Sequence, residues 1–173
     1  MKVVLLGYMG VGKSTLGRVL ADSFKFNFID LDSYIENKED MSIPEIFKIK
    51  GEIYFRKLES QCLKEILAKD EDIVLSLGGG TPVYANNMQE IIDYQDVTSV
   101  YLKLQLDELV SKLFQQRSSR PLISHYKDKS EFEEFVRKHL FERQQFYFLA
   151  DYVLDLSGKT VDESLSELQD LIN

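Results

Sequence analysis

The stretch "GYMGVGKST", residues 7–15, follows the apolar run "VVLL" and decides the fold. Two of its glycines bracket four residues and precede Lys13 and Ser14, which gives the pattern G-x-x-x-x-G-K-S of a phosphate-binding loop. Glycines allow a backbone on which several N–H groups converge on an anion, and the helix that begins here adds the positive end of its dipole. The residues expected to bind the nucleotide phosphates are Gly10, Val11, Gly12, Lys13, Ser14 and Thr15.

The residues on both sides of this loop support the interpretation. "MKVVLLG" is a buried-strand pattern, and "STLGRVLADSF" places four apolar side chains on one helical stripe, Leu16, Val19, Leu20 and Phe24. An ordinary glycine-rich turn with a surface lysine would not explain this strand–loop–helix context. Within the loop, Lys13 is expected to reach the β- and γ-phosphates of ATP, and the Ser14 hydroxyl is expected to ligate Mg²⁺.

Length and composition limit the class of protein. The 173 residues predict a single domain, 1–173, and the formal net charge is −8. That charge argues against nucleic acid as the main partner, and no basic run indicates a membrane surface. The one cysteine, Cys62, lies in an apolar helical pattern and is expected to be a small core side chain. With no leader or long apolar run evident, we expect a cytoplasmic protein, and we expect it to be a monomer.

Five strand-like runs alternate with helical patterns along the chain. They are "KVVLLG", "FNFID", "DIVLSL", "VTSVYLKL" and "YVLDL". This alternation is typical of α/β proteins, and continuous apolar runs are typical of parallel strands buried on both faces. We therefore predict a three-layer α/β/α domain with a five-stranded parallel sheet. The pattern S/T-x-x-E predicts helix starts at three places, Ser42 with Glu45, Ser130 with Glu133, and Thr160 with Glu163.

One polar stretch has no periodicity, "QQRSSRPLISHYKDKS". It carries two arginines, Arg117 and Arg120, in an otherwise acidic chain. A disordered surface loop is one interpretation of this stretch. We favour a mobile active-site lid at about 115–128, because arginines there can act on bound anions.

Two further motifs lie where buried strands end. "FIDLD" places Asp30 and Asp32 at alternate positions, at the edge where open α/β sheets bind ligands. One carboxylate can organise the water shell of Mg²⁺ while the other accepts a hydrogen bond from a substrate hydroxyl, although Asp32 would also serve as a helix N-cap. "LSLGGGT", residues 75–81, brings three glycines to the same edge, which indicates close approach of a small ligand to the backbone.

A phosphate-binding loop alone does not separate a switch protein from an enzyme. "NKED", residues 37–40, matches the guanine-reading motif N-K-x-D of GTPases, and "DLSG", residues 155–158, matches their D-x-x-G. In GTPases the D-x-x-G element comes well before N-K-x-D. The order here is reversed, which argues against a GTPase.

Together these motifs resemble the shikimate kinase family, which is similar to the nucleoside monophosphate kinases. The resemblance covers essentially the whole chain and rests on "GYMGVGKST", "FIDLD", "SIPEIFKIKGEIYFRKLE", "LSLGGGT", "RPLI" and "FERQQFY", in family order. It implies a P-loop kinase fold with a mobile lid and a substrate-binding region at about 31–60. It also implies transfer of a phosphoryl group from ATP to the 3-hydroxyl of shikimate, with Mg²⁺, in aromatic amino-acid biosynthesis.

The resemblance implies roles for individual acidic and basic residues. Asp30 is expected to hold Mg²⁺ through water, and Asp32 to bind the ring hydroxyls of shikimate and to act as the base. Arg56 and Arg143 match the arginines that bind the shikimate carboxylate, and Glu59 is expected to orient Arg56.

It implies further roles for the glycine run and the lid. The glycines whose backbone is expected to contact the shikimate ring are Gly78, Gly79 and Gly80. Arg120 matches the lid arginine that reaches the substrate and the transferring phosphate. The expected catalytic residues are thus Lys13, Asp32 and Arg120. Arg117 is expected to stack on adenine.

Three departures from the family pattern affect these expectations. Gln145 stands where the family often has proline, and Arg117 lies closer to Arg120 than in some relatives. The family's adenine-side arginine after the last strand has no clear match, and Lys159 is the candidate substitute.

The alternatives are another small-molecule kinase, acting on gluconate or a nucleoside monophosphate, and a non-catalytic nucleotide-binding regulator. Nucleotide kinases usually read G-K-G-T in the loop, gluconate kinases lack the "GGG" motif, and a regulator has no need of the full set of charged residues.

Overall fold

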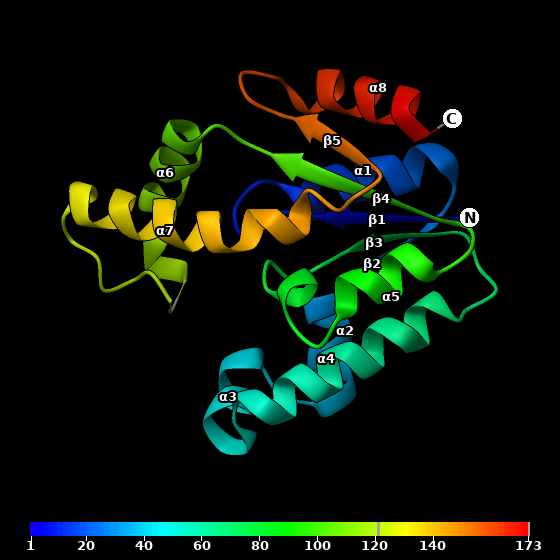
Figure 1. The fold of residues 1–173 in the computed structure, drawn as a ribbon, viewed down its shortest axis with the longest axis horizontal. Helices are drawn as coiled ribbons and strands as arrows, with labels where there is room; N and C mark the ends of the chain where they lie inside the picture. The colour runs from blue at the N-terminus through cyan, green and yellow to red at the C-terminus, as the bar shows by residue number, and fades with distance from the viewer. Residues whose placement is uncertain (121, 173) are drawn as a thin grey trace.

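The structure, a computed structural model, describes residues 1–120 and 122–172. Its centre is one sheet of five parallel strands in the order β2-β3-β1-β4-β5 (Figure 1). The strands are β1 (Lys2–Leu6), β2 (Asn27–Asp30), β3 (Ile73–Ser76), β4 (Val97–Lys103) and β5 (Tyr152–Asp155). β1 pairs with β3 and β4, and all of its residues are buried. The predicted five-stranded parallel sheet is confirmed.

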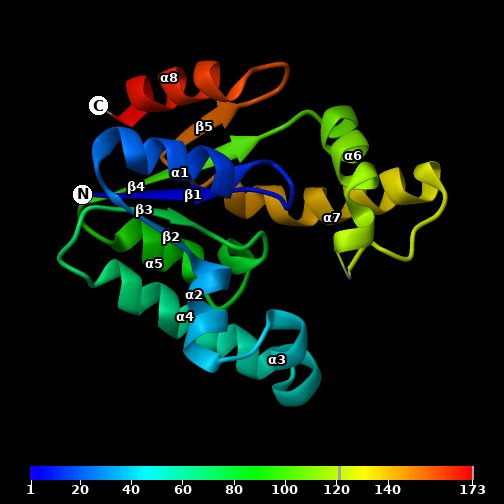
Figure 2. The same ribbon diagram turned by 180° about the vertical axis from the view of Figure 1, so that it is seen from behind.

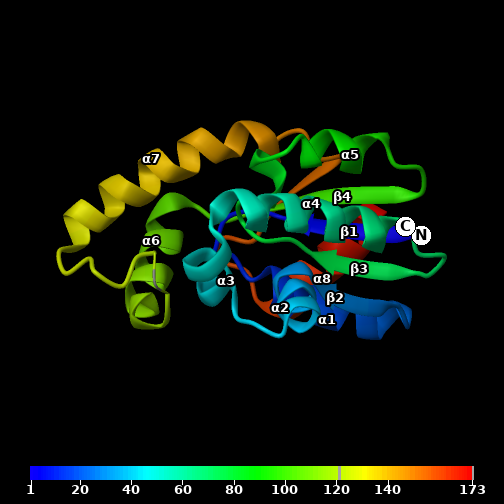
Figure 3. The same ribbon diagram turned by 90° about the horizontal axis from the view of Figure 1, so that it is seen from below.

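Helices cover both faces of this sheet and make three layers (Figures 2 and 3). α1 (Lys13–Phe24) and α8 (Val161–Ile172) pack against each other on one face. α4 (Glu52–Leu67) and α5 (Asn87–Asp93) cover the other face, with the C-terminal half of α7 (Lys129–Tyr147) on the same side. The predicted three-layer α/β/α arrangement is therefore confirmed.

Two groups of short elements extend the sheet edge at which the strands end. Between β2 and α4 lie α2 (Leu31–Glu39) and α3 (Ile43–Lys50). After β3 the glycine run leads into the 3₁₀ helix η1 (Thr81–Val83), and after β4 the chain forms α6 (Leu106–Gln115) and the 3₁₀ helix η2 (Arg117–Ser119).

The predicted lid joins two helices that project from the sheet. α6 and the N-terminal half of α7 extend away from the body of the molecule, and the segment 116–128 connects them (Figure 1). Pro121 of the "RPLI" motif lies outside the described residues. The mobility of the lid stays a prediction.

The predicted helix starts are correct in two of three places. Ser42 and Glu45 form a capping box at α3, and at α8 the Thr160 N–H donates to the Glu163 carboxylate over 2.8 Å. The prediction at Ser130 is wrong. The cap of α7 is Asp128, whose carboxylate accepts from the Ser130 and Glu131 N–H groups, both at 2.9 Å. A carboxylate two residues earlier satisfies two unpaired donors, so the helix begins there.

The core confirms the apolar patterns. In α1, Leu16 and Leu20 are buried, while Val19 and Phe24 pack against the core as partly buried side chains. Cys62 is fully buried in α4, which confirms its role as a small core side chain. Among the described residues, no helix is long and apolar enough to cross a bilayer.

Candidate active site

The phosphate-binding loop connects β1 to α1 at the carboxyl end of the sheet. Gly7, Gly10 and Gly12 have φ angles of 141°, 78° and 108°, which L-amino acids with side chains rarely adopt. A Cβ at Gly7 would also lie 2.4 Å from the carbonyl oxygen of Leu102. The loop borders a cavity of about 320 Å³, here named the phosphate cavity. Its lining includes Gly10, Gly12, Lys13, Ser14, Thr15, Asp30, Asp32, Gly78, Gly79 and Arg120.

Lys13 is buried and folds back across its own loop. Its Nζ donates to the carbonyl oxygens of Gly7, at 2.9 Å, and Tyr8, at 3.0 Å. Burial lowers the pKa of Lys13 to about 8, an effect that the nearby charges of Asp32 and Asp30 partly oppose. The ammonium group therefore lies in a poorly hydrated site beside the phosphate cavity, where an anionic ligand would further favour its charged form.

Asp30 and Ser14 form an oxygen-only pair beside the loop. The Ser14 hydroxyl donates to Asp30 Oδ2 over 2.6 Å, and Asp30 Oδ1 accepts from the Ser33 N–H, so that Asp30 rather than Asp32 caps α2. Among the described residues, no group of three or more His, Cys, Asp or Glu side chains could form a complete metal cage. One carboxylate and one hydroxyl facing a phosphate site fit Mg²⁺, which keeps water and phosphate oxygens as its other ligands.

Asp32 lies in the first turn of α2 and lines the phosphate cavity. Burial raises its pKa to about 6, and the negative charges of Asp30 and Glu59 add to the effect. Its carboxylate approaches the glycine run, since a Cβ at Gly78 would lie 2.9 Å from Asp32 Oδ1. A carboxylate with a raised pKa in a cavity is suited to accept a proton near neutral pH.

The three consecutive glycines provide space rather than unusual backbone angles. None of them has a positive φ. A Cβ would lie 3.3 Å from the Met9 nitrogen at Gly79 and 3.0 Å from Arg56 Nη1 at Gly80. The run therefore allows site residues to approach the backbone closely, which the sequence alone did not predict.

A second cavity of about 850 Å³, here named the arginine cavity, adjoins the phosphate cavity. Met9 and Gly79 line both, so a thin wall of backbone and one side chain separates them. Most of the residues that close its other sides come from α3, α4 and α7, and Tyr84 follows η1. They include Phe47, Arg56, Tyr84, His139 and Arg143.

Arg56 is held by a buried acidic partner. Its Nη1 donates to Glu59 Oε2 over 2.8 Å, and its guanidinium lies 4.0 Å from the centre of the Tyr84 ring. Glu59 is 1% exposed, and its other oxygen accepts from the Thr81 hydroxyl over 2.6 Å. The Nε of Arg56 is buried without a hydrogen-bond partner among the described residues. The guanidinium is thus fixed in orientation and keeps donor capacity for an anion.

Arg143, on α7, also lines the arginine cavity. Its Nη1 donates to the carbonyl oxygen of His139 over 3.1 Å. His139 Nδ1 lies 2.6 Å from the Tyr8 hydroxyl of the phosphate-binding loop. Burial and the charge of Arg143 lower the pKa of His139 to about 4, so the ring is neutral at physiological pH. One turn further, the Tyr147 hydroxyl donates to the carbonyl oxygen of Gly79.

The two lid arginines are placed differently. Arg120 lines the phosphate cavity, and its Nε is buried without a partner in the described part of the chain. Arg117 lines neither of the two cavities. Its Nε donates to the Tyr126 carbonyl over 3.0 Å, and its guanidinium stacks 4.0 Å from the centre of the Phe114 ring. In this structure Arg117 contacts other lid residues, and its stacking on adenine stays a prediction.

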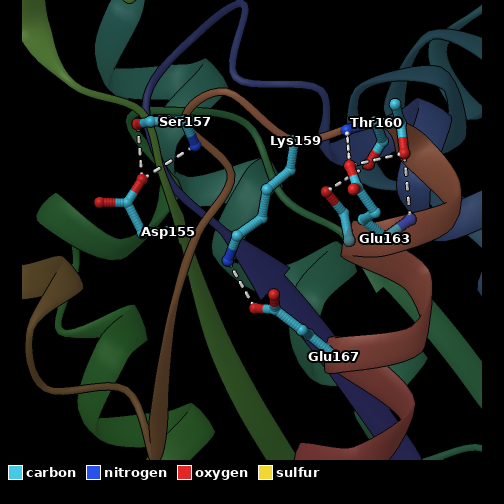
Figure 4. A network of polar contacts seen from close by, with 7 residues as sticks. Asp155, Ser157, Lys159, Thr160, Glu163 and Glu167 are labelled. Atoms are coloured by element: carbon cyan, nitrogen blue, oxygen red, sulfur yellow. Dashed lines mark hydrogen bonds and ion pairs between the residues drawn. The ribbon is translucent and has the colours of Figure 1, made fainter.

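A smaller cavity of about 140 Å³, here named the side cavity, opens on the other side of the loop. It is lined by Val11, Gly12, Thr15, Lys112, Leu156, Lys159 and Thr160, among others. Lys159 Nζ forms an ion pair with Glu167 of α8, and Glu163 caps the same helix through Thr160 (Figure 4). Lys112 of α6 borders both the side cavity and the phosphate cavity.

Several of these residues were missed by the sequence reasoning. No role was assigned from the sequence to Tyr8, His139, Tyr147 or Lys112. The available signal was the spacing of four residues between His139, Arg143 and Tyr147, which places all three on one face of a helix.

Comparison with known proteins agrees with this geometry. A family model described as shikimate kinase matches residues 9–173. The shikimate kinase of Flavobacterium johnsoniae is 44% identical over 171 residues, covering 99% of this chain and 98% of that protein. The chain belongs to the shikimate kinase family.

Solved structures of this family share the fold closely. A crystal structure of the shikimate kinase from Bacteroides thetaiotaomicron matches with a TM-score of 0.90 and 33% identity, covering 99% of this chain and 98% of that chain. The shikimate kinase from Acinetobacter baumannii in complex with shikimate matches with a TM-score of 0.85 and 29% identity, covering 99% and 92%. The P-loop kinase fold is thereby confirmed.

Proposed function

We propose that this member of the shikimate kinase family transfers the γ-phosphoryl group of ATP to the 3-hydroxyl of shikimate. The observation that carries the proposal is the pairing of two cavities across a shared wall. One is bordered by the phosphate-binding loop, and the other is lined by both Arg56 and Arg143. Shikimate carries one carboxylate and three hydroxyls, and a guanidinium is the planar bidentate partner of a carboxylate.

The arginine cavity would bind the acceptor by its carboxylate. Arg56 enters the site pre-oriented, because Glu59 and the Tyr84 ring hold its guanidinium. Arg143 supplies a second positive charge from α7. With the carboxylate fixed at this end, the ring hydroxyls point toward the wall formed by Met9 and Gly79, and the glycine run lets the ring approach the backbone.

Asp32 would accept a hydrogen bond from the reacting hydroxyl near that wall. Its pKa of about 6 leaves the carboxylate mostly ionised at neutral pH, so that it can accept the hydroxyl proton as the oxygen attacks phosphorus. Whether the proton moves fully or is only shared, the hydrogen bond orients the oxygen for in-line attack.

The phosphate cavity would hold the donor. Lys13 and Arg120 lie on it as cations, and the backbone of Gly10, Gly12 and Ser14 supplies the loop N–H groups. Ser14 and Asp30 would hold Mg²⁺, Asp30 through water. When bound, this ion neutralises charge on the β- and γ-phosphates.

Lid closure and the nucleotide base complete the proposal. Arg120 sits on the segment 116–128, so closure of this lid would bring its charge to the transferring phosphate and exclude water. The side cavity is the candidate site for the base, with Lys159 and Lys112 at its border. We propose that the protein acts as a monomer in the cytoplasm, with no role for nucleic acid.

A coupled ADP-release assay tests the proposal. The purified protein is given ATP and Mg²⁺ with shikimate, gluconate or AMP in turn. We expect turnover with shikimate alone, and mass spectrometry should find one phosphate added to shikimate. Turnover with gluconate or AMP in preference to shikimate would assign the site to one of the alternative kinases, and no turnover with any of them would favour a non-catalytic regulator.

A further inference from the structure

One face of α7 carries side chains that reach every part of the site. Residues four apart lie on the same face of a helix. Along α7 this face presents Phe135, His139, Arg143 and Tyr147. Each of them touches a different neighbour, so one rigid element meets the lid, the phosphate-binding loop, the arginine cavity and the glycine run.

The two ends of this face contact the lid and the glycine run. The Phe135 ring packs 5.2 Å from the ring of Tyr126, which belongs to the lid segment, and stacks 5.0 Å from the His139 ring. At the other end, Tyr147 is fully buried and donates to the Gly79 carbonyl. Both ends of the face are thus anchored, and the middle of the helix carries His139 and Arg143.

Tyr8 connects this helix to the phosphate cavity. It is 2% exposed, although it belongs to a phosphate-binding loop. Its carbonyl oxygen accepts from Lys13 Nζ over 3.0 Å, while its hydroxyl shares a hydrogen bond of 2.6 Å with His139 Nδ1. One residue therefore touches the lysine that serves the phosphates and the helix that carries Arg143.

His139 passes the connection on to the arginine cavity. Its carbonyl oxygen accepts from Arg143 Nη1 over 3.1 Å. An uninterrupted series of contacts thus runs from Lys13 through Tyr8 and His139 to Arg143. A small shift of the phosphate-binding loop can therefore reach Arg143 through these contacts, without any helix or strand unfolding.

We propose that the Tyr8–His139 hydrogen bond is a positioning contact that couples the nucleotide site to the acceptor site. When a nucleotide orders the phosphate-binding loop, Tyr8 is fixed, and through His139 it fixes the turn of α7 that presents Arg143. Shikimate then binds a site that the nucleotide has already ordered, so its binding loses less conformational entropy. By reciprocity, shikimate strengthens nucleotide binding by the same factor. The inference rests on the proposed function, because it takes shikimate as the ligand of Arg143.

The test measures this coupling directly by titration calorimetry. The dissociation constant of shikimate is determined without nucleotide and with saturating ADP and Mg²⁺, and the ratio of the two is the coupling factor. For the unaltered protein we expect a factor of at least about five, the lower end of typical couplings between sites. A factor of one in the unaltered protein would overturn the proposal.

Two single variants and their combination isolate the bond. Tyr8→Phe removes only the hydroxyl, and His139→Phe removes the ring nitrogens while keeping a ring to stack on Phe135. Each variant should lower the coupling factor by about three- to tenfold, as expected for the loss of one hydrogen bond. If the coupling factor of the unaltered protein is smaller than this reduction, the variant should show a factor of one. Because both remove the same interaction, the double variant should lower it no further. Additive losses would show that the two residues act separately and would refute the proposal.

Conservative rescue and a matched control exclude a merely structural effect. His139→Gln retains a hydrogen-bonding group and should keep more of the coupling than His139→Phe does. Tyr101→Phe removes the hydroxyl of another buried tyrosine, 2% exposed in β4, and should leave the coupling factor unchanged. Urea unfolding of each variant checks that it is folded, and if Tyr8→Phe fails to fold, the pair His139→Phe and His139→Gln still decides. If the coupling behaves as described but no shikimate is phosphorylated, the proposed function fails and the positioning contact stands.

Discussion

Arg56 offers the sharpest test of the acceptor site, because its substitution should affect two measurable quantities by different routes. The guanidinium is held by Glu59 at 2.8 Å and lies over the Tyr84 ring. Its buried Nε has no hydrogen-bond partner among the described residues and lies 3.7 Å from Oε1 of the exposed Glu52. Arg56→Ala removes the proposed carboxylate ligand. It also leaves the buried carboxylate of Glu59 with Thr81 as its remaining hydrogen-bond donor.

The two effects have different magnitudes. Loss of a charge-assisted hydrogen bond costs about 1.5–3 kcal/mol, which predicts roughly 10- to 150-fold weaker shikimate binding. Removing one partner of a buried ion pair costs about 3–5 kcal/mol of stability. The lower end applies here, because the Arg56 side chain is 21% exposed and Thr81 still donates to Glu59. Nucleotide affinity should stay within about twofold apart from the loss of coupling, since Arg56 does not line the phosphate cavity.

Calorimetric titration with shikimate and, separately, with ADP and Mg²⁺ measures the two affinities, and urea unfolding measures stability. Arg56→Lys should recover part of the binding, because an ammonium group cannot reproduce the planar fork. The double variant Arg56→Met, Glu59→Gln removes both charges and should recover stability without recovering binding. Arg137→Ala is the matched control, since this arginine is 63% exposed and pairs with Glu133 on the surface of α7.

The refuting result is a reversal of the pattern. If Arg56→Ala lost nucleotide affinity and kept shikimate affinity, the assignment of the two cavities would be wrong. If the double variant recovered shikimate binding together with stability, Arg56 would act on folding and not as a ligand of the carboxylate.

Four other predictions concern the site. Lys13→Ala should fold and lose turnover by roughly 10³-fold or more, measured by ADP release, because the cation at the transferring phosphate is gone; near-normal turnover would contradict its role. Amide hydrogen exchange in 115–128 should slow when ADP and shikimate are both bound, and equal exchange in both states would rule out a closing lid. The kcat/KM should rise with pH through about 6, as Asp32 ionises, and fall above about 8, as Lys13 loses its charge. Burial makes the pKa of Asp32 higher in the folded protein than in the unfolded chain, so the ionisation of Asp32 lowers the stability of the fold as the pH rises from about 4 to about 6. Asp32→Asn should therefore resist urea better than the unaltered protein at neutral pH. A profile of kcat/KM that is flat across about pH 5 to 7 would contradict the role of Asp32 as a base.

The fold was predictable from the sequence because its signals are local. The five strands are short apolar runs. In the phosphate-binding loop, Gly7, Gly10 and Gly12 mark the positions at which the backbone needs a positive φ angle. Helix starts were less secure where several capping residues compete. At α7 two candidates, Asp128 and Ser130, lie two positions apart, and Asp128 caps because it accepts two N–H groups at once. At α2 the helix begins directly after β2, which gives the cap to Asp30 and places Asp32 inside the first turn.

The contacts within the site were less predictable because they join segments far apart in the chain. Tyr8 and His139 are separated by 131 positions, and Tyr147 and Gly79 by 68. No local pattern reports such a pairing. The contacts of Arg117 were equally hidden in the sequence, since its Nε and Nη1 donate to the carbonyl groups of Tyr126 and Phe114.

The thin wall between the two cavities explains why the site combines rigid and permissive residues. Direct transfer requires the hydroxyl and the γ-phosphate to meet in line, so little protein can stand between them. At this point the Met9 backbone and Gly79 lie so close that a Cβ at Gly79 would be 3.3 Å from the Met9 nitrogen. Gly79 has no side chain to pack against the protein, so the position of its backbone must be set by its neighbours. Tyr147 holds Gly79 by its carbonyl, and the Tyr8–His139 bond holds the residue next to Met9. Both contacts come from α7, the helix that carries Arg143, so the position of the acceptor and the position of the wall are set by the same element.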